Sequence, residues 1–244
     1  MPLEHPLVPG GVARATGRAS NVDEYRVQLL MDRSLQPGEE ISSFHPAVVE
    51  LLGVEPNLSW WKDHDGNVVN VRARWNGHTL SLVEDDPPAE VIPVLPLQGN
   101  PPSIGAGARP AGYLLPAEQR QASEDLFTVG ALVSFWVDAS DPAHPVAWAT
   151  ATDSAKVRRR LLPLYGSSLR LIDSRWDSAT LDKIRSVLRS IPSEILYSFG
   201  ESHGVDHQPL LRATVKLLTE ELAEELRDFP EDAFALEVLI HSDA

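Results

Sequence analysis

Residues 58–84, LSWWKDHDGNVVNVRARWNGHTLSLVE, carry the strongest local signal for the fold. Asp65-Gly66 and Asn76-Gly77 are both two-residue turn signals, because a type I′ turn needs positive φ at its two central residues. Since side chains alternate along a strand, placing both dipeptides in turns puts one apolar set on one face. That set is Leu58, Trp60, Val69, Val71, Ala73, Trp75, Leu80 and Leu82. The stretch therefore predicts a three-stranded antiparallel meander over 58–84, with Ala73 opposite Leu80.

The other face of this meander is polar and carries Trp61, Arg72 and Arg74. An exposed tryptophan beside two arginines can stack on a base or a sugar, or form the centre of a protein interface. Burial of Trp61 under a neighbouring segment is the structural alternative. The pattern makes these three residues a candidate binding surface.

The rest of the N-terminal half divides by composition. Residues 1–20 are rich in Pro, Gly and Ala without periodicity, which predicts an extended arm. Residues 45–53 begin near a proline and end at a glycine, which predicts a short helix. A β-rich subdomain is thus expected over 21–97, followed by a Pro/Gly linker over 98–112.

The second half, 113–244, alternates between strand and helix patterns. Asp153 or Ser154 and Asp177 or Ser178 are typical N-caps of two helices. Strands are expected at 146–150, 168–173, 194–199 and 234–241. Leu211, Val215, Leu218, Leu222 and Leu226 share one helical stripe, which predicts a long helix after the loop at 200–207. The fold class is therefore α+β, a meander followed by a mixed sheet covered by helices, and we find no internal repeat.

Composition and missing motifs argue against several classes of function. The chain has 21 basic and 35 acidic residues, a net charge of −14, so nucleic acid is a poor candidate partner. It has no cysteine, which excludes disulfides, thiolate metal sites and a cysteine nucleophile. Neither a signal peptide nor a membrane-spanning run is apparent, so we expect a soluble, cytoplasmic protein. The common phosphate-loop, dinucleotide and serine-hydrolase motifs are also missing.

The loop at 200–207, GESHGVDH, is the densest group of potential ligands. His203, Asp206 and His207 could hold a divalent metal such as zinc, with Glu201 activating a water as general base. In the structural alternative, Asp206 caps the following helix and the histidines are solvated. Metal-assisted hydrolysis at this loop is one functional hypothesis.

The only basic run lies in the helix that is expected to begin at Asp153 or Ser154. Lys156, Arg159 and Arg160 are expected to face away from the core, where they could hold a phosphate or an acidic partner. We expect a non-catalytic α+β protein that binds a protein or peptide partner, in an immunity, chaperone or accessory role. The metal-assisted hydrolase is the alternative, so the sequence leaves open whether the chain is an enzyme.

Overall fold

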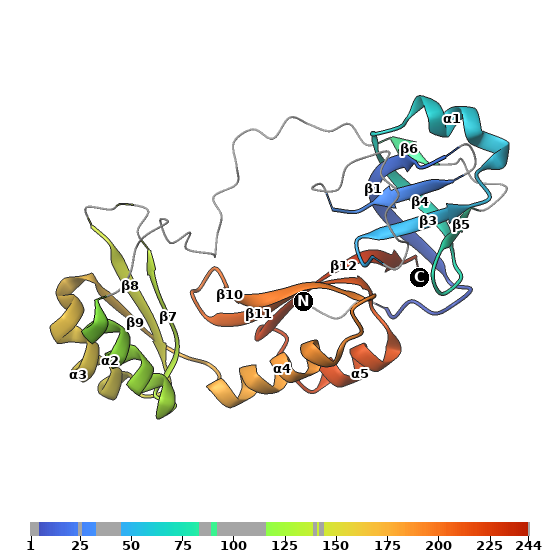
Figure 1. Cartoon of the computed structure of the whole chain (residues 1–244). Helices are drawn as coiled ribbons and strands as arrows, with labels where there is room; N and C mark the ends of the chain where they lie inside the picture. The colour runs from blue at the N-terminus through green and yellow to red at the C-terminus, as the bar shows by residue number, and fades with distance from the viewer. Residues whose placement is uncertain are drawn as a thin grey trace.

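The computed structural model describes residues 5–23, 26–32, 45–82, 89–91, 116–138, 141 and 144–243, and they form an α+β protein. Figure 1 shows a barrel on the right, a small sheet with two helices on the left, and a second helix-covered sheet between them. Each part has its own cluster of buried apolar side chains. The α+β class is confirmed, but the N-terminal part is a barrel and not a simple meander, and the predicted linker over 98–112 lies outside the described residues.

Five strands form the barrel: β1 (Val12–Asn21), β2 (Val27–Leu30), β3 (Val48–Leu52), β4 (Val68–Trp75) and β5 (Leu80–Leu82). Around the ring, β1 pairs with β2, β2 with β3, β3 with β5 and β5 with β4, and β4 closes on β1. Only the β3–β5 pair is parallel among these five. A two-residue strand, β6 (Glu90–Val91), adds to β4. Five strands also make the barrel of OB-folds, but a shared architecture does not indicate a function.

β1 corrects the prediction of an extended arm over 1–20. Its inward positions include Ala13, Ala15 and Ala19, which are buried, whereas Arg14 and Thr16 are exposed. Because the inward side chains are small, the alternation does not stand out as a hydrophobic pattern. Gly17 lies close to the neighbouring strand, where an added Cβ would come 3.1 Å from the carbonyl oxygen of Leu30. The residue thus allows two backbones to approach closely.

The meander predicted over 58–84 is only partly right. Leu58–Asp63 forms a helix, α1, after a 3₁₀ turn over Glu55–Asn57, and Asp65-Gly66 follows the helix and does not join two strands. Trp61 on α1 is 0% exposed and packs edge-on against Trp60, with ring centroids 4.8 Å apart. The side chain that was expected on an open polar face therefore lies inside the barrel core.

The second hairpin of that stretch, β4–β5, is present with its predicted faces. Its connection contains four residues, 76–79, so Trp75 lies opposite Leu80 and Ala73 opposite Leu82. This register differs by two residues from the predicted one. Since side chains alternate with a period of two, the shift leaves the same residues facing inward. Val69, Val71, Ala73 and Trp75 are all buried, as expected.

Residues 48–52 form a strand, β3, within the range 45–53 where a short helix was predicted. Val49 and Leu51 are buried on one face and Val48 on the other, whereas Leu52 at the end of the strand is 41% exposed, so both faces are covered only where the strand begins. A strand covered on both sides has no alternation of polar and apolar residues and resembles one turn of an apolar helix. The β-branched Val48-Val49 pair favours the strand.

Two successive units of the second half have the same order of elements, helix–strand–strand–helix–strand. The first is α2 (Ala117–Thr128), β7 (Leu132–Asp138), β8 (Val146–Ala151), α3 (Ser154–Tyr165) and β9 (Leu169–Asp173), with a 3₁₀ turn at Gly166–Ser168 before β9. The second is α4 (Ser178–Ser190), β10 (Leu196–His203), β11 (Pro209–Leu217), α5 (Glu220–Arg227) and β12 (Phe234–Ser242). In both, the first pair of strands is antiparallel and the second pair is parallel.

Matching irregularities show that these units are structural repeats. The β7–β8 register shifts between Leu132 and Ser134, and the β10–β11 register shifts between Leu196 and Ser198. Each of the two residues at the second shift therefore lies 64 residues after its equivalent at the first shift. Ser134 pairs with Thr150 in the first repeat, and Ser198 pairs with Thr214 in the second. The expectation of no internal repeat was therefore wrong, because the repetition lies in topology and register.

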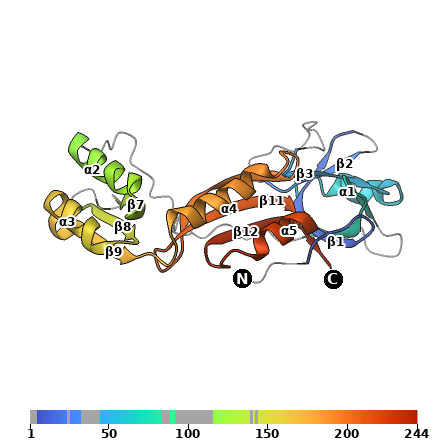
Figure 2. The same ribbon diagram turned by 90° about the horizontal axis from the view of Figure 1, so that it is seen from below.

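Residues 209–217 form strand β11, which corrects the long helix predicted there. Leu211, Ala213 and Val215 are buried against α4 and α5, whereas Arg212 between them is exposed. Figure 2, seen from below, shows α4 and α5 lying across β11 and β12. A helix begins only at Glu220, where the Thr219 hydroxyl accepts a hydrogen bond from the backbone N–H of Leu222.

The second repeat is joined to the barrel through its last strand. β12 pairs antiparallel with β1, so that Ala13 lies opposite Ser242 and Ala15 opposite Ile240. One continuous nine-stranded sheet therefore runs from β10 through the barrel. The two halves that the sequence suggested as separate subdomains share backbone hydrogen bonds.

Within the described ranges, no helix has the length and apolar character needed to cross a bilayer.

Candidate functional site

The loop at 200–207 is the end of a β-hairpin between β10 and β11. Gly204 N donates to Gln208 O and His207 N donates to Gly204 O, which closes the turn. His207 has a φ of 61°, in the left-handed region that non-glycine residues seldom adopt. Asp206 therefore caps no helix, contrary to the structural alternative considered for it.

This hairpin end docks on the helix-free face of the first repeat. The His203 ring lies 3.7 Å from Trp136 between centroids, and the His207 ring stacks on Trp148 at 4.1 Å. Trp136 and Trp148 are cross-strand partners on β7 and β8, and their rings are parallel at 5.9 Å. Two histidines of one repeat thus cover two tryptophans of the other.

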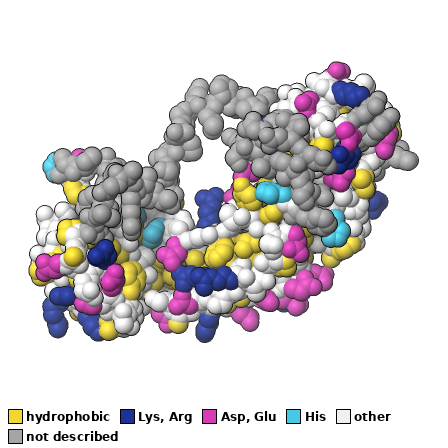
Figure 3. Space-filling view, in the orientation of Figure 1, with side chains coloured by type: hydrophobic (Ala, Val, Ile, Leu, Met, Phe, Trp, Pro, Cys, Tyr) yellow, Lys and Arg dark blue, Asp and Glu magenta, His cyan; other side chains and the backbone are white. Residues whose placement is uncertain are grey.

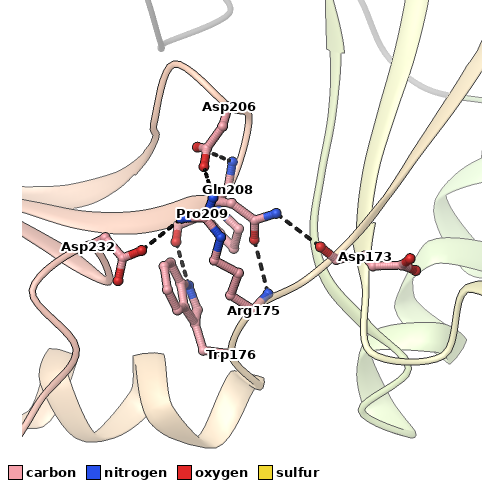
Figure 4. Close-up of polar contacts among 7 residues, drawn as sticks. All are labelled: Asp173, Arg175, Trp176, Asp206, Gln208, Pro209 and Asp232. Carbon is pink, nitrogen blue, oxygen red and sulfur yellow. Dashed lines mark hydrogen bonds and ion pairs between the residues drawn. The ribbon is translucent and has the colours of Figure 1, made fainter.

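A salt-bridge network surrounds the turn (Figure 4). Arg175, in the connection between the repeats, lies between two carboxylates. Its guanidinium is 2.6 Å from Asp206 on the hairpin and 2.7 Å from Asp232 before β12. These side chains are all partly exposed, so each ion pair alone contributes little to stability. Their convergence orients the hairpin end.

Three further hydrogen bonds, made by the buried side chains of Gln208 and Trp176, fix the hairpin more firmly (Figure 4). Gln208 is 7% exposed, accepts a hydrogen bond from Arg175 N at 3.1 Å and donates one to Asp173 O at 2.9 Å. Trp176 Nε1 donates to Pro209 O at 2.6 Å. Since these buried polar groups are satisfied across the junction, separation of the repeats would expose or orphan them.

His203 is the most electrostatically perturbed residue of this junction. Burial and, to a smaller extent, the neighbouring His207 lower its pKa to about 4. The ring is therefore neutral at pH 7. Its Nε2 lies 3.1 Å from the Ser134 hydroxyl, which is itself 2.7 Å from Thr150 Oγ1.

The Ser134–His203 pair resembles a nucleophile and its base, but the surroundings do not suit catalysis. The adjoining cavity has a volume of only about 40 Å³, space for about one water molecule. A histidine with a pKa near 4 is also a weak base at neutral pH. We assign the pair to holding the two repeats together.

The predicted metal ligands do not converge on one point. Glu201 is ion-paired with Arg185 of α4, and Asp206 is ion-paired with Arg175. His203 contacts Trp136, and His207 stacks on Trp148. Among the described residues, no three His, Asp or Glu side chains gather as a metal ion requires. Zinc binding, and the general-base role of Glu201, stay predictions without a supporting contact.

The predicted surface of Trp61, Arg72 and Arg74 is not assembled either. Trp61 is buried, as described above, so it is not accessible to a partner. Arg72 donates to Asp243 at 2.5 Å, and Arg74 donates to the carbonyl oxygen of Gly10 at 3.3 Å. The two arginines therefore connect β4 to the residue that follows β12 and to the segment that precedes β1.

The basic run on α3 is where the structure retains an open site. Val157 and Leu161 are buried beneath the helix, and Arg160 is ion-paired with Asp125 of α2 at 3.2 Å. On the outside, a shallow open groove is lined by Ser154, Ala155, Arg158, Arg159, Leu162 and Pro163, which we call the α3 surface. Lys156 is exposed on the same helix. Of the predicted binding residues, Lys156 and Arg159 face outward as expected, whereas Arg160 is engaged by α2.

The sequence reasoning missed the apolar part of this surface. Ala155 and Leu162 are seven residues apart, two helical turns, and both are exposed, Leu162 to 46%. They form a second, outward stripe opposite the buried Val157 and Leu161. The sequence did contain a signal for this apolar stripe, because Leu162 is an apolar residue on the basic side of the helix.

No protein-family model, curated protein or solved structure matches this chain.

Proposed function

We propose that this chain is a non-catalytic binding protein that engages an acidic protein or peptide through the α3 surface. The observation that carries the proposal concerns the ion pairing of Arg158 and Arg159 on α3. On a chain with 35 acidic residues, no acidic side chain within the described ranges pairs with Arg158 or Arg159. These two guanidinium groups flank the exposed Leu162.

The mixture of charge and apolar area favours a protein over a nucleic acid. The net charge of −14 repels a phosphate backbone at long range, and stacking side chains are absent from the residues that line the groove. Leu162 and Pro163 instead offer apolar contact to a side chain of the partner. A short amphipathic segment, apolar on one side and acidic on the other, complements both features.

Figure 3 shows how local this positive charge is. Lys and Arg side chains gather at the lower end of the left-hand part of the molecule, over α3, whereas Asp and Glu gather below the middle part, near α5. α3 and α5 are the equivalent helices of the two repeats, yet α5 carries Glu220, Glu221, Glu224 and Glu225 on its exposed side. The repeats therefore present opposite charges from the same structural position.

The test uses the full chain and a synthetic amphipathic helix with Leu on one face and Glu on the other. Fluorescence anisotropy would follow binding as the salt concentration rises. We expect binding that weakens with salt and falls about tenfold or more in the Arg158→Glu, Arg159→Glu double variant. Leu162→Ala should weaken it with little change in salt dependence.

A matched control removes the same charge elsewhere. Lys183 and Arg189 are exposed on α4, so the Lys183→Glu, Arg189→Glu variant has the same net charge as the α3 variant. It should bind the peptide nearly as well as the unaltered chain. Equal losses in both double variants would mean that only overall charge matters. Tighter binding of a polyphosphate than of the peptide would also contradict a protein partner.

A further inference from the structure

A groove lies where the end of α4 meets the start of α5. Its volume is about 260 Å³. Ile191, Pro192 and Ile195 line it from the connection that follows α4, and Leu222 lines it from α5. Leu222 is 5% exposed, and Ile191 and Ile195 pack against the core to which it belongs. Packing therefore fixes this apolar wall, and we call the site the α4–α5 groove.

Two glutamates form the acidic side of the same groove. Glu221 and Glu225 are one helical turn apart on α5, so both project from the same side of the helix. Both are exposed, and neither forms an ion pair with another residue in the ranges that the structure describes. The groove thus offers apolar contact beside two carboxylates that have no cationic partner there.

The α3 surface has the complementary arrangement. Arg158 and Arg159 precede Leu162 by about one turn of the helix, so both guanidinium groups lie beside the exposed leucine. A helix of this kind can place its apolar residue in the groove while its cations meet the glutamates. The two surfaces match in both charge and apolar character.

These surfaces lie apart within one molecule. Figure 1 and Figure 2 both show α3 at one end of the molecule, whereas α4 and α5 lie in its middle part. The docking of the β10–β11 hairpin on Trp136 and Trp148 holds the two repeats in this arrangement. A contact between the α3 surface and the α4–α5 groove therefore joins two molecules.

We propose that the α3 surface of one molecule docks in the α4–α5 groove of a second copy of this chain. The inference rests on the proposed function of the α3 surface and names its acidic partner. Leu162 contacts the apolar wall of the groove, and Arg158 and Arg159 pair with Glu221 and Glu225. Because the two surfaces differ, the contact is heterologous, and copies add head to tail until a ring closes or a chain extends.

The net charge of −14 on each copy opposes this association only at long range. In about 0.1 M salt, electrostatic interactions between exposed charges are screened beyond about 10 Å, so neighbouring charges outweigh distant ones. One helix in one groove also covers less surface than a standard interface of about 1,600 Å². We therefore expect weak association that depends on protein concentration.

Sedimentation velocity of the full chain at increasing protein concentration tests the proposal. The mean mass should rise with concentration. Arg158→Glu with Arg159→Glu (the α3 variant) and Glu221→Arg with Glu225→Arg (the groove variant) should each weaken association about tenfold or more. An unaltered chain that is monomeric at every concentration would overturn the proposal.

Exchange of the charges gives the sharpest comparison. A chain with all four substitutions has the net charge of the unaltered chain and should associate again, because the opposite charges still face each other. As a matched control, Glu118→Arg with Glu124→Arg changes the charge of exposed residues on α2 by the same amount as the groove variant. It should associate as the unaltered chain does. No recovery in the fourfold variant, or an equal loss in the α2 control, would contradict the assigned contact.

The groove variant also separates this inference from the proposed function. Its α3 surface is intact, so it should still bind the synthetic Leu/Glu helix although it no longer associates with itself. A chain that binds this helix but stays monomeric would overturn the second copy as partner and leave the function of the α3 surface in place. A chain that does neither would contradict both.

Discussion

His203 illustrates how one residue couples the assembly of this molecule to pH. Its pKa in the folded protein is about 4, below the value of about 6.5 expected for the unfolded chain. The unfolded state therefore takes up a proton first as the pH falls. The stability contributed by the neutral ring is complete above pH 6.5 and is lost as the pH falls toward 4.

This gives a prediction for the His203→Gln variant. Glutamine can still hydrogen-bond to Ser134 but cannot take up a proton. Between pH 7 and pH 5 the unaltered chain should lose about 1 kcal/mol more stability than the variant, allowing for screening of a half-buried ring. Urea unfolding at both pH values measures this difference. Parallel pH profiles for the two proteins would show that His203 is not the group responsible.

Trp61 shows why single residues of the site were misplaced from sequence. Its burial depends on whether 58–63 is a strand or a helix, because that choice decides which of Trp60 and Trp61 faces the core. The helix has only six residues, too short for a periodic pattern to reveal it. Residues within regular strands, such as Val71 and Ala73, were placed correctly because their alternation is local.

At the level of elements, the two repeats use the same device to start their second helix. Asp153 accepts a hydrogen bond from Lys156 N at 3.0 Å, and Thr219 accepts one from Leu222 N at 3.2 Å. The caps thus occupy equivalent positions in α3 and α5. Both satisfy a backbone donor that the helix itself leaves unpaired.

We expect Asp153→Ala to destabilise α3 by about 1 kcal/mol, because alanine cannot accept this hydrogen bond. Amide hydrogen exchange in α3 should become about fivefold faster where it occurs by local opening. Asp153→Asn retains the cap and should behave like the unaltered chain. If the alanine variant exchanged at the original rate, the cap would not limit the opening of α3.

The elements that were predicted correctly are those whose signals are local. The caps at Asp153 and Asp177, the apolar stripe of α4 and the final strand all follow from short patterns. β11 was misread because Leu211 and Val215 are four residues apart, which suits a helix as well as a strand. Ala213 and Leu217 complete the period of two, but alanine gives a weak signal.

For the whole molecule, the decisive contacts are between residues far apart in the chain. The barrel closes through β1 and β4, and β1 also pairs with β12 near the other end of the chain. Neither pairing leaves a pattern in either strand alone. The sequence therefore predicted an α+β class, but neither the barrel nor the docking of one repeat on the other.

A truncation tests the role of β12. Removal of residues 234–244 leaves the first half of β1 without one of its two neighbours and takes Ile240 from the barrel core. We expect the barrel to lose cooperative unfolding by near-ultraviolet circular dichroism, and a separate peptide of residues 234–242 to restore it in part. Removal of residues 243 and 244 alone should have a far smaller effect. A fully cooperative barrel in the longer truncation would show that β12 is dispensable.

The pairing of β1 with β12 also bears on how this protein is made. β12 begins more than two hundred residues after β1 ends, so one edge of β1 is synthesised long before its partner strand. An unpaired strand edge can bind to another chain. Its alanine-rich inner face and its exposed Arg14 and Thr16 make β1 a poor template for such contacts, and so the nascent chain can carry an open edge until β12 is synthesised.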